Sequence, residues 1–312
     1  MIRKILISTS SFGVAGNDSL RKLADDGFEL VLNPHCRRLN ETEAIELLDN
    51  DVIAMIAGIE PLTRKVLTHA KQLKVISRCG TGMDNVDIDA ANELGILLKN
   101  TPDAPARAVA ELTLGMILAV LRRIAEADRG IRAANWAPLM GRLLSEQTVG
   151  LIGYGRVGKR VARLVHAFGA RVIVYDNQQH PAEKGIEFLS LHDVIGQADV
   201  LSLHVPYSKE LHHLLNRERL ATMKQGAVLI NAARGGLIDE NALSEALQSA
   251  HLAGAALDCF QTEPYDGPLV DLPQVVLTAH MGSYANEARA LMEREAADNL
   301  LAGLAGLGLI KG

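Results

Sequence analysis

Residues 148–176 contain, in one uninterrupted run, a short strand, a glycine turn, a helix, a second strand and an acid. An apolar, β-branched segment leads into a turn with Gly153, Gly155 and Gly158, and apolar residues then recur at helical spacing. The second predicted strand ends on Asp176, 18 residues after Gly158. This order predicts a parallel βαβ unit, which restricts the chain to folds with a helix-covered parallel sheet.

Each part of this run has a physical task in binding a dinucleotide. Gly153 allows a tight turn, Gly155 lets backbone N–H groups approach a pyrophosphate, and Gly158 permits close packing of helix on strand. The helix N-terminus directs its dipole at the phosphates. Asp176 can accept two hydrogen bonds from an adenosine ribose. A glycine triplet alone is weak evidence, but here the strand, the helix and the acid accompany it.

The residues after Asp176 favour NAD over NADP. NADP sites usually provide an arginine near this position, which neutralises the 2′-phosphate. Here the next three residues are Asn and Gln, and the next Lys or Arg is Lys184. Because a carboxylate repels a phosphate, we expect NAD as the cofactor. The alternative is a strand-end acid that is only solvated.

Length and composition restrict the classes of protein further. A chain of 312 residues suggests two domains, and 48% hydrophobic residues suffice for two cores. The net charge is 32 minus 37, or −5, without a long basic run, so nucleic acid is not an expected partner. The cysteines Cys36, Cys79 and Cys259 lack metal-ligand spacing. We expect reduced thiols, a cytoplasmic protein and no metal site.

No segment has the pattern of a membrane anchor. The first residues, MIRKILIST, are typical of a strand and lack a signal-peptide pattern. The longest apolar stretch, Leu112 to Leu121, is far shorter than the roughly 18 residues that span a bilayer. We therefore expect a soluble protein without a membrane partner.

Strand and helix patterns alternate along the chain in two series. In the first series, strands are predicted at 4–9, 28–32, 52–57, 74–77 and 96–98, with helices near 18–26, 40–48, 63–70 and 87–94. In the second series, strands are predicted at 148–152, 171–175, 200–205, 227–232, 254–258 and 275–279. Asn40 and Glu43 have the spacing of a capping box. The fold class is therefore α/β, with two Rossmann-like parallel-sheet domains.

Two apolar helices bear on how the domains are assembled. Residues 104–124 are apolar on more than one face, so we expect this helix to be buried between domains or between subunits of a homodimer. Residues 286–307 form a terminal helix that we expect to pack back on the N-terminal domain. The predicted domains are a discontinuous substrate domain, 1–100 plus 285–312, and an NAD-binding domain, 101–284. The cleft between them should close on NAD and substrate.

Three polar residues lie where strands of the second domain are predicted to end. Arg234 follows one strand, Glu263 lies just beyond the next, and His280 follows the last directly. Ligands of open α/β sheets bind outside the carboxyl ends of strands. Arginine holds a carboxylate by two parallel hydrogen bonds, histidine exchanges a proton near neutral pH, and a carboxylate orients the imidazole. Taken singly, each residue could be a surface ion-pair partner or a loop residue, but the three together favour a catalytic set.

At these positions the chain resembles the D-isomer-specific 2-hydroxyacid dehydrogenases, in particular their phosphoglycerate dehydrogenase branch. The resemblance covers nearly the whole chain. It is strongest at 78–87 (RCGTGMDNVD), 109–112 (VAEL), 143–158, 231–235 (NAARG), 258–264 (DCFQTEP) and 278–282 (TAHMG).

The resemblance implies an activity and a role for each site residue. Arg234 is implied to bind the substrate's carboxylate and keto group, His280 to be the acid/base, and Glu263 to pair with His280. Asp258 is implied to hold the nicotinamide carboxamide. The implied cofactor contacts are Gly153, Gly155, Arg156, Val157, Gly158, Asp176, His204, Val205, Pro206, Ala232, Ala233, Asp258, Gly282 and Ser283. For the residues 204–206, a purely structural strand end is the alternative.

The resemblance also implies a substrate-binding segment near residue 80. Backbone N–H groups of Thr81 and Gly82 are implied to contact the substrate carboxylate, and glycines at 80 and 82 suit such an anion nest. An ordinary turn is the alternative for Gly80 and Gly82. Arg78 is a candidate clamp for a distal anionic group.

Departures from the family pattern leave the substrate open. Residues 101–105 are TPDAP where the family often has Thr-Pro-Gly-x-Asn. The segment 57–61 carries an acid, Glu60, where phosphoglycerate-specific members tend to carry a basic residue. Glyoxylate, hydroxypyruvate, 3-phosphohydroxypyruvate and other short anionic keto acids therefore all remain candidates.

Two other functions compete with an NAD-dependent oxidoreductase of small D-2-hydroxy acids. An NAD-sensing scaffold or co-repressor of the same fold is the first, although a scaffold could lose the Arg–Glu–His set that this chain retains. A formate dehydrogenase is the second. It is disfavoured because that branch has Gln in the position of Glu263.

Overall fold

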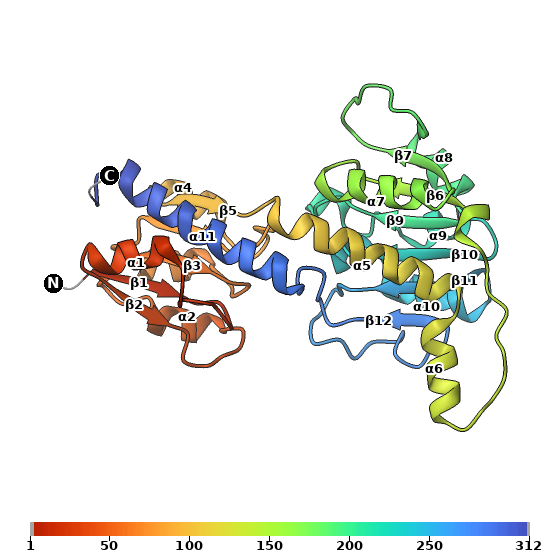
Figure 1. Cartoon of the computed structure of the whole chain (residues 1–312), viewed down its shortest axis with the longest axis horizontal. Helices are drawn as coiled ribbons and strands as arrows, with labels where there is room; N and C mark the ends of the chain where they lie inside the picture. The colour runs from red at the N-terminus through yellow and green to blue at the C-terminus, as the bar shows by residue number, and fades with distance from the viewer. Residues whose placement is uncertain (1–2, 311–312) are drawn as a thin grey trace. The chain divides into compact units, whose positions relative to one another are not determined.

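The computed structural model describes residues 3–310, and the chain divides into two α/β units. The first unit is Met1–Pro105 with Ala285–Gly312, and the second is Ala106–Tyr284. Each unit has its own parallel sheet, shown as two sets of arrows in Figure 1. The predicted fold class of two parallel-sheet α/β domains is thereby confirmed.

The first unit contains a five-stranded parallel sheet in the order β2-β1-β3-β4-β5. Its strands are β1 (Arg3–Ile7), β2 (Phe28–Leu32), β3 (Val52–Ala57), β4 (Val75–Arg78) and β5 (Leu97–Asn100). Its helices are α1 (Asp18–Asp25), α2 (Glu41–Leu47), α3 (Arg64–His69), α4 (Ile88–Glu93) and α11 (Asn286–Gly306). The strand order reverses direction between β1 and β3, which is where open α/β sheets bind ligands.

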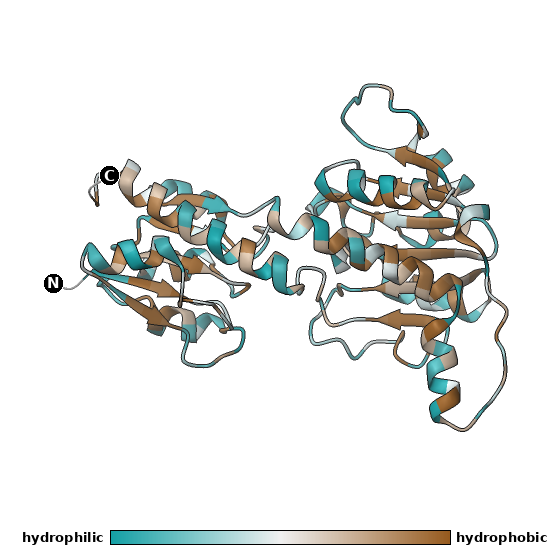
Figure 2. Ribbon diagram, viewed as in Figure 1, coloured by the Kyte–Doolittle hydropathy of each residue, from teal (hydrophilic) through white to brown (hydrophobic). Residues whose placement is uncertain are grey.

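Alternating side chains of this sheet build two separate cores. On one face, Leu6, Met55 and Ile76 pack against residues of α2, α3 and α4. On the other face, Ile5 and Ile56 pack against α1 and α11, which lie side by side in Figure 1. The strands are accordingly hydrophobic, while the helices carry their polar residues away from the sheet (Figure 2). The expectation that the terminal helix returns to the N-terminal domain is confirmed.

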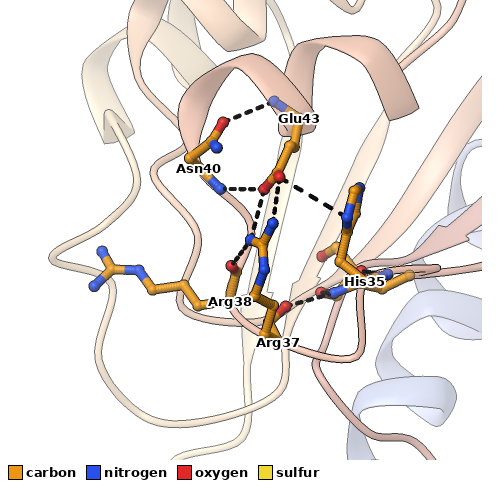
Figure 3. Close-up of polar contacts among 7 residues, drawn as sticks. His35, Arg37, Arg38, Asn40 and Glu43 are labelled. Carbon is orange, nitrogen blue, oxygen red and sulfur yellow. Dashed lines mark hydrogen bonds and ion pairs between the residues drawn. The ribbon is translucent and has the colours of Figure 1, made fainter. Parts of the chain in front are cut away.

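The start of α2 shows how local sequence determines one helix boundary. The Asn40 side chain accepts the backbone N–H of Glu43, and the Glu43 carboxylate accepts the backbone N–H of Asn40, which confirms the predicted capping box (Figure 3). Arg37 also donates two hydrogen bonds to Glu43, at 2.6 and 2.9 Å. The hydrogen bonds from Arg37 and from the Asn40 backbone lower the pKa of Glu43 to about 2.

The second unit contains a seven-stranded parallel sheet in the order β12-β11-β10-β9-β6-β7-β8. Its strands are β6 (Thr148–Ile152), β7 (Arg171–Tyr175), β8 (Ile186–Phe188), β9 (Val200–Leu203), β10 (Ala227–Asn231), β11 (Leu252–Leu257) and β12 (Val275–Leu277). Its α-helices are α5 (Ala104–Leu121, which begins in the first unit), α6 (Ile124–Arg132), α7 (Arg156–Ala167), α8 (Leu191–Gln197), α9 (Arg217–Thr222) and α10 (Glu240–Gln248). Three short 3₁₀ helices are η1 (Leu144–Glu146), η2 (Lys209–Leu211) and η3 (Gly235–Leu237). The order reverses between β6 and β9, which is the switch point of a dinucleotide-binding fold.

Helix α5 packs on one face of this sheet together with α7. Met116, Ile117 and Leu121 contact the same core as Val149 and Val161. By length and composition, α5 is long and apolar enough to cross a membrane. The sequence prediction found no such segment, because it counted only the apolar stretch 112–121. Helix α5 is 56% buried inside the protein, and core helices of soluble proteins pass the same test. The other face of the sheet is covered by α8, α9 and α10.

Several element boundaries differ from the sequence predictions. The strands predicted to end at 9, 205, 232, 258 and 279 end at Ile7, Leu203, Asn231, Leu257 and Leu277. At β9 the chain leaves the sheet shortly before Pro206, which has no N–H to donate to a neighbouring strand. The helix predicted to reach 124 ends at Leu121, because Arg123 adopts a left-handed φ of 53°. The short strand β8 and the helix α6 were not predicted.

Candidate active site

The glycine turn after β6 has the geometry that a pyrophosphate needs. Gly153 has a φ of 103°, and a Cβ there would lie 2.5 Å from the carbonyl oxygen of His204. A Cβ on Gly158 would lie 2.1 Å from the Gly153 carbonyl oxygen. At Gly155, by contrast, a Cβ would meet no heavy atom of the described residues within 4 Å, apart from the chain neighbours. Gly155 is the N-cap of α7, so open space lies beside a helix N-terminus without a capping side chain.

Asp176, at the end of β7, is held against this turn. Its carboxylate accepts the backbone N–H of Tyr154 at 2.6 Å and of Gln178 at 2.8 Å. Burial opposes ionisation, but these hydrogen bonds outweigh it and lower the pKa of Asp176. Asp176 is therefore an ionised acceptor beside the glycine turn, as a ribose-binding acid must be.

An aromatic cluster next to Asp176 was missed by sequence reasoning. The ring of His180 packs edge-on against Tyr154 and is stacked on Phe188, and its Nε2 lies 3.4 Å from an oxygen of Asp176. The Tyr154 hydroxyl donates to Glu183 at 2.7 Å. The only signal in the sequence was that His180 follows Asp176 by four residues. This spacing does not identify Tyr154 and Phe188 as partners of His180, because they come from other segments.

The end of β9 lies beside the same turn. The backbone N–H of His204 donates to the Ile152 carbonyl at 2.7 Å, and the Nε2 atom of the His204 ring lies 2.9 Å from the Ser202 hydroxyl. Burial of the ring lowers the pKa of His204 to about 4, so the imidazole is neutral at physiological pH. Val205 and Pro206 follow as the chain leaves the sheet. The position next to the glycine turn fits a cofactor wall and equally fits a structural strand end.

The turn after β10 is shaped by Asn231 and Gly235. Buried Asn231 accepts the Ala233 N–H at 3.1 Å and donates to the Arg234 carbonyl at 2.9 Å. Gly235 packs so closely against the backbone of Phe260 that a Cβ at position 235 would lie 1.8 Å from the Phe260 carbonyl carbon. Ala232 and Ala233 are thus held in a tight turn, with Arg234 directly before η3. The Arg234 guanidinium donates to the Ala233 carbonyl at 2.7 Å.

Glu263 and His280 form a direct pair. The Nδ1 atom of His280 lies 3.0 and 3.1 Å from the two carboxylate oxygens of Glu263. His280 has a left-handed φ of 50°, a conformation that costs energy for a residue with a side chain. The hydrogen bond with Cys259, which sequence reasoning missed, and the one with Glu263 raise the pKa of His280 to about 10. Such a histidine stays protonated at neutral pH and can donate a proton.

Asp258 anchors the loop that carries His280. Its buried carboxylate accepts the Thr278 hydroxyl at 2.6 Å and the backbone N–H groups of Met281 and Gly282, each at 2.8 Å. Ser283 follows in the same loop. The implied contact of Asp258 with a nicotinamide stays a prediction, but its positioning of the His280 loop is evident from these three bonds.

A second acid, Glu240, lies close to the Glu263–His280 pair. It accepts the backbone N–H of Gln261 at 2.7 Å. Burial, with Asp239 and Glu263 as neighbouring charges, raises the pKa of Glu240. Because β10, β11 and β12 are adjacent and parallel, their carboxyl ends bring Arg234, Glu263 and His280 to one edge of the sheet.

The first unit holds the substrate-binding residues that the resemblance implies. Arg78 is buried at the end of β4 and donates to the Cys79 carbonyl. Gly80 has a φ of 145°, and a Cβ there would lie 2.5 Å from the Arg78 guanidinium. The Gly80 N–H donates to the Thr101 hydroxyl at 2.8 Å, and the Asn100 side-chain amide donates to the Thr81 carbonyl. Gly82 follows in the same bend.

Glu60 is the acid in the segment where phosphoglycerate-specific members of the resembled family tend to carry a basic residue, and its side chain is buried. It accepts the Ser8 hydroxyl and, at 3.1 Å, the backbone N–H of Gly58. These bonds tie the segment after β1 to the segment after β3, so Glu60 has a structural role at the switch point of this sheet.

Comparison with known proteins agrees with this geometry. Residues 114–282 match the model of the "D-isomer specific 2-hydroxyacid dehydrogenase, NAD binding domain". The chain is 43% identical over 258 residues to a D-3-phosphoglycerate dehydrogenase of Mycobacterium leprae, which covers 81% of the chain and 49% of the relative. It is 36% identical over 284 residues to a hydroxypyruvate reductase of Thermotoga maritima, which covers 88% and 92%. The chain thus spans about half the length of the first curated relatives it matches.

Solved structures share the whole fold. A glyoxylate reductase from Paecilomyes thermophila superposes with a TM-score of 0.88 at 29% identity, covering 99% of this chain and 97% of that one. A D-lactate dehydrogenase from Aquifex aeolicus, solved with NAD and lactic acid, gives 0.83 at 28% identity, covering 98% and 96%.

Proposed function

Because the chain belongs to the D-isomer specific 2-hydroxyacid dehydrogenase family, with NAD as its cofactor, we propose that it transfers a hydride between NAD(H) and a small D-2-hydroxy acid or 2-keto acid. The observation that carries the proposal is the Glu263–His280 pair at the same sheet edge as Arg234. The turn residues Gly153, Gly155 and Gly158 and the ionised Asp176 fit the cofactor.

The residues of this chain divide the reaction between them. When bound, NADH supplies the hydride from its nicotinamide ring. Arg234 binds the substrate carboxylate and stabilises the negative charge that develops on the keto oxygen. His280, protonated and held by Glu263 through Nδ1, donates a proton to that oxygen from Nε2. In the oxidation direction neutral His280 accepts the hydroxyl proton.

The substrate is proposed as a class of compounds. Relatives are named for phosphoglycerate, hydroxypyruvate and glyoxylate. These substrates share a carboxylate next to the reacting carbon, which Arg234 can bind in two-pronged fashion. Roles for Arg78, Gly80, Thr81 and Gly82 in substrate binding remain part of this proposal.

NADH consumption over a panel of 2-keto acids tests the function. The panel compares glyoxylate and hydroxypyruvate with 3-phosphohydroxypyruvate, and the His280→Gln variant serves as the inactive control. We expect turnover of at least one acid by the parent enzyme and its loss in the variant. Absence of turnover with every acid, together with intact NADH binding, would favour the scaffold or co-repressor alternative. The formed Glu263–His280 pair argues against that alternative.

We further propose that the protein is a homodimer. Sequence reasoning placed the interface on the helix over 104–124, but 56% of α5 is already buried, and Met116, Ile117 and Leu121 pack in the core of its own unit. Exposed apolar side chains gather instead on α6 and the loop that follows it: Ile124, Ile131, Trp136, Met140 and Leu143. Trp136 is 88% and Met140 87% exposed. Large apolar residues in one segment support covering by a second copy of the chain.

A cytoplasmic location and small-molecule partners complete the proposal. All three cysteines are free thiols, which supports a reducing compartment. The net charge of −5, without a long basic run, argues against nucleic acid as a partner.

A further inference from the structure

The catalytic pair has a third neighbour that the proposed reaction does not use, the thiol of Cys259. One donor atom each from Cys259, Glu263 and His280 lies within 4.8 Å of the other two. Thiolate sulfur, carboxylate oxygen and imidazole nitrogen are the ligands that Zn²⁺ binds in proteins. Three such ligands with an open fourth position are the usual composition of a reactive zinc site.

The three ligands are held in place by their surroundings. Cys259 lies two residues after β11 and is 2% exposed. Glu263 accepts the backbone N–H of Phe260 at 3.1 Å, and Asp258 anchors the His280 loop by three hydrogen bonds. A site whose ligands are already positioned loses little conformational freedom when it binds a cation.

Once His280 has lost its proton to solvent, the carboxylates around the site favour a cation. Glu240 and Glu263 are near enough to raise the pKa of Glu240 by repulsion in addition to burial. A divalent cation on Glu263 reduces that repulsion. The side chains of His280 and Glu263 are 41% and 28% exposed, so solvent ions have access to the site and a water can complete the coordination.

The spacing of the donors is also close to that of a zinc site. Tetrahedral Zn²⁺ with bonds of about 2.0–2.3 Å separates its ligand atoms by about 3.3–3.8 Å. The His280 Nδ1 atom and the Glu263 oxygen, 3.0 Å apart, therefore need to separate by a few tenths of an ångström. No other pair of donors, all within 4.8 Å, needs to approach by more than about 1.5 Å, which rotations of these side chains allow. The buried sulfur selects a thiophilic cation over Mg²⁺ or Ca²⁺, which prefer oxygen ligands.

We infer that Cys259, Glu263 and His280 bind one Zn²⁺ ion, and that this ion reversibly inhibits the enzyme. Binding releases the thiol proton and any imidazolium proton to solvent and changes no oxidation state. An ion bound at Nδ1, the nitrogen that faces Glu263, leaves Nε2 as the N–H of a neutral imidazole. That group is a much weaker acid than the imidazolium and has no lone pair to accept a proton, so His280 can no longer exchange a proton with substrate. The inhibition rests on the proposed function, whereas the binding does not.

Binding is tested first without any activity measurement. Equilibrium dialysis of the whole chain against micromolar Zn²⁺ should retain one ion per chain. Co²⁺ in its place should give a sulfur-to-cobalt charge-transfer band in the near ultraviolet, because a thiolate is a ligand. Cys259→Ser should remove that band and weaken Zn²⁺ binding about tenfold or more.

Cys36→Ser is the matched control, since Cys36 is the exposed thiol and lies in the other unit. It should keep both the band and the affinity. Cys79 is buried, and burial raises the pKa of its thiol to about 11, so it competes poorly for metal. A band that persists in Cys259→Ser, or disappears in Cys36→Ser, overturns the assignment.

A second measurement needs no variant and so covers the case in which Cys259→Ser does not fold. Zn²⁺ should slow alkylation of Cys259 in the parent protein, followed by peptide mass spectrometry, while alkylation of Cys36 is unchanged. Equal rates with and without Zn²⁺ contradict the site.

Inhibition is then measured as the rate of keto-acid reduction against Zn²⁺, with each variant normalised to its own metal-free rate. We expect inhibition that a chelator reverses and that Cys259→Ser shifts to at least tenfold higher Zn²⁺. If no keto acid is reduced but the Co²⁺ band depends on Cys259, the proposed function fails and the metal site stands. If reduction occurs and is insensitive to Zn²⁺ at saturating binding, the inhibitory role is wrong.

Discussion

The carboxylate of Glu263 holds His280 by its Nδ1 atom, at 3.0 and 3.1 Å from the two oxygens. An imidazole engaged in this way presents Nε2 to a substrate, and the negative charge beside it stabilises the protonated ring. One contact between residues 17 positions apart thus orients the ring and, together with the hydrogen bond from Cys259, raises its proton affinity.

Glu263→Gln should lower the pKa of His280 from its value of about 10, because the amide keeps the shape but lacks the charge. Reduction needs protonated His280, so its activity should be lost at lower pH than in the parent enzyme. Oxidation needs the neutral ring and should persist to lower pH. The measurement is kcat/KM against pH for reduction and for oxidation, which gives for each reaction the pH at which activity is lost. If these two pH values do not change in the variant, or if they shift in opposite directions, Glu263 has a positioning role only.

Arg234→Lys should impair catalysis strongly, because an ammonium group cannot reproduce the planar two-pronged contact with a carboxylate. We expect a loss in kcat/KM equivalent to roughly 2–4 kcal/mol, the scale of removing one group that stabilises transition-state charge. Arg217→Lys is the control, since Arg217 pairs with Glu245 on the surface. Equal activities of the two variants would assign Arg234 to the surface as well.

Replacing Asp176 with Ser and Asn177 with Arg should increase the use of NADPH relative to NADH. The change removes the carboxylate that repels a 2′-phosphate and adds a cation that binds it. The ratio of kcat/KM for the two cofactors is the measurement. Because Asp176 also accepts the Tyr154 N–H, the variant should lose some NADH activity through a looser glycine turn. A parent enzyme that already prefers NADPH would refute the interpretation of Asp176.

Gly155→Ala and Gly158→Ala should separate cofactor binding from folding. A Cβ at 155 meets open space, so stability should change by less than about 1 kcal/mol, while NADH affinity falls because the methyl group occupies the pyrophosphate approach. A Cβ at 158 lies 2.1 Å from the Gly153 carbonyl oxygen, so this variant should lose about 1–3 kcal/mol of stability or more. Urea unfolding and NADH titration give the two quantities, and equal NADH affinities of parent and Gly155→Ala would count against the phosphate site.

The exposed segment after α5 should mediate dimerisation. Trp136 is the only tryptophan of the chain, so its fluorescence reports on this segment directly. Met140→Glu should produce monomers in sedimentation and shift Trp136 emission to longer wavelength, because a buried charge opposes association. Val270→Glu, at an exposed apolar residue elsewhere in the same unit, is the control and should remain dimeric. A parent protein that is monomeric at micromolar concentration would exclude the dimer.

Contacts between residues close in the sequence were predictable. The capping box of Asn40 and Glu43, the glycine turn and the acid at the end of β7 each depend on spacing within one or two elements. Arg234, Glu263 and His280 could be placed at one sheet edge because parallel strands align their carboxyl ends. The alternation of strand and helix patterns along the chain likewise predicted two parallel sheets, since parallel strands are joined by helices that cover the sheet.

Contacts between distant segments were decided only by the tertiary structure. The sequence does not show that Cys259 lies against His280, that Glu60 is bound by Ser8, or that Asp258 holds the His280 loop. Strand ends depend on the neighbouring strand, so β9 and β12 are shorter than their apolar patterns. Likewise, apolar character on several faces of α5 did not show which of them its own sheet covers. The periodicity of a chain determines its elements, whereas the partners of each side chain are determined by packing between elements, which a single sequence does not record.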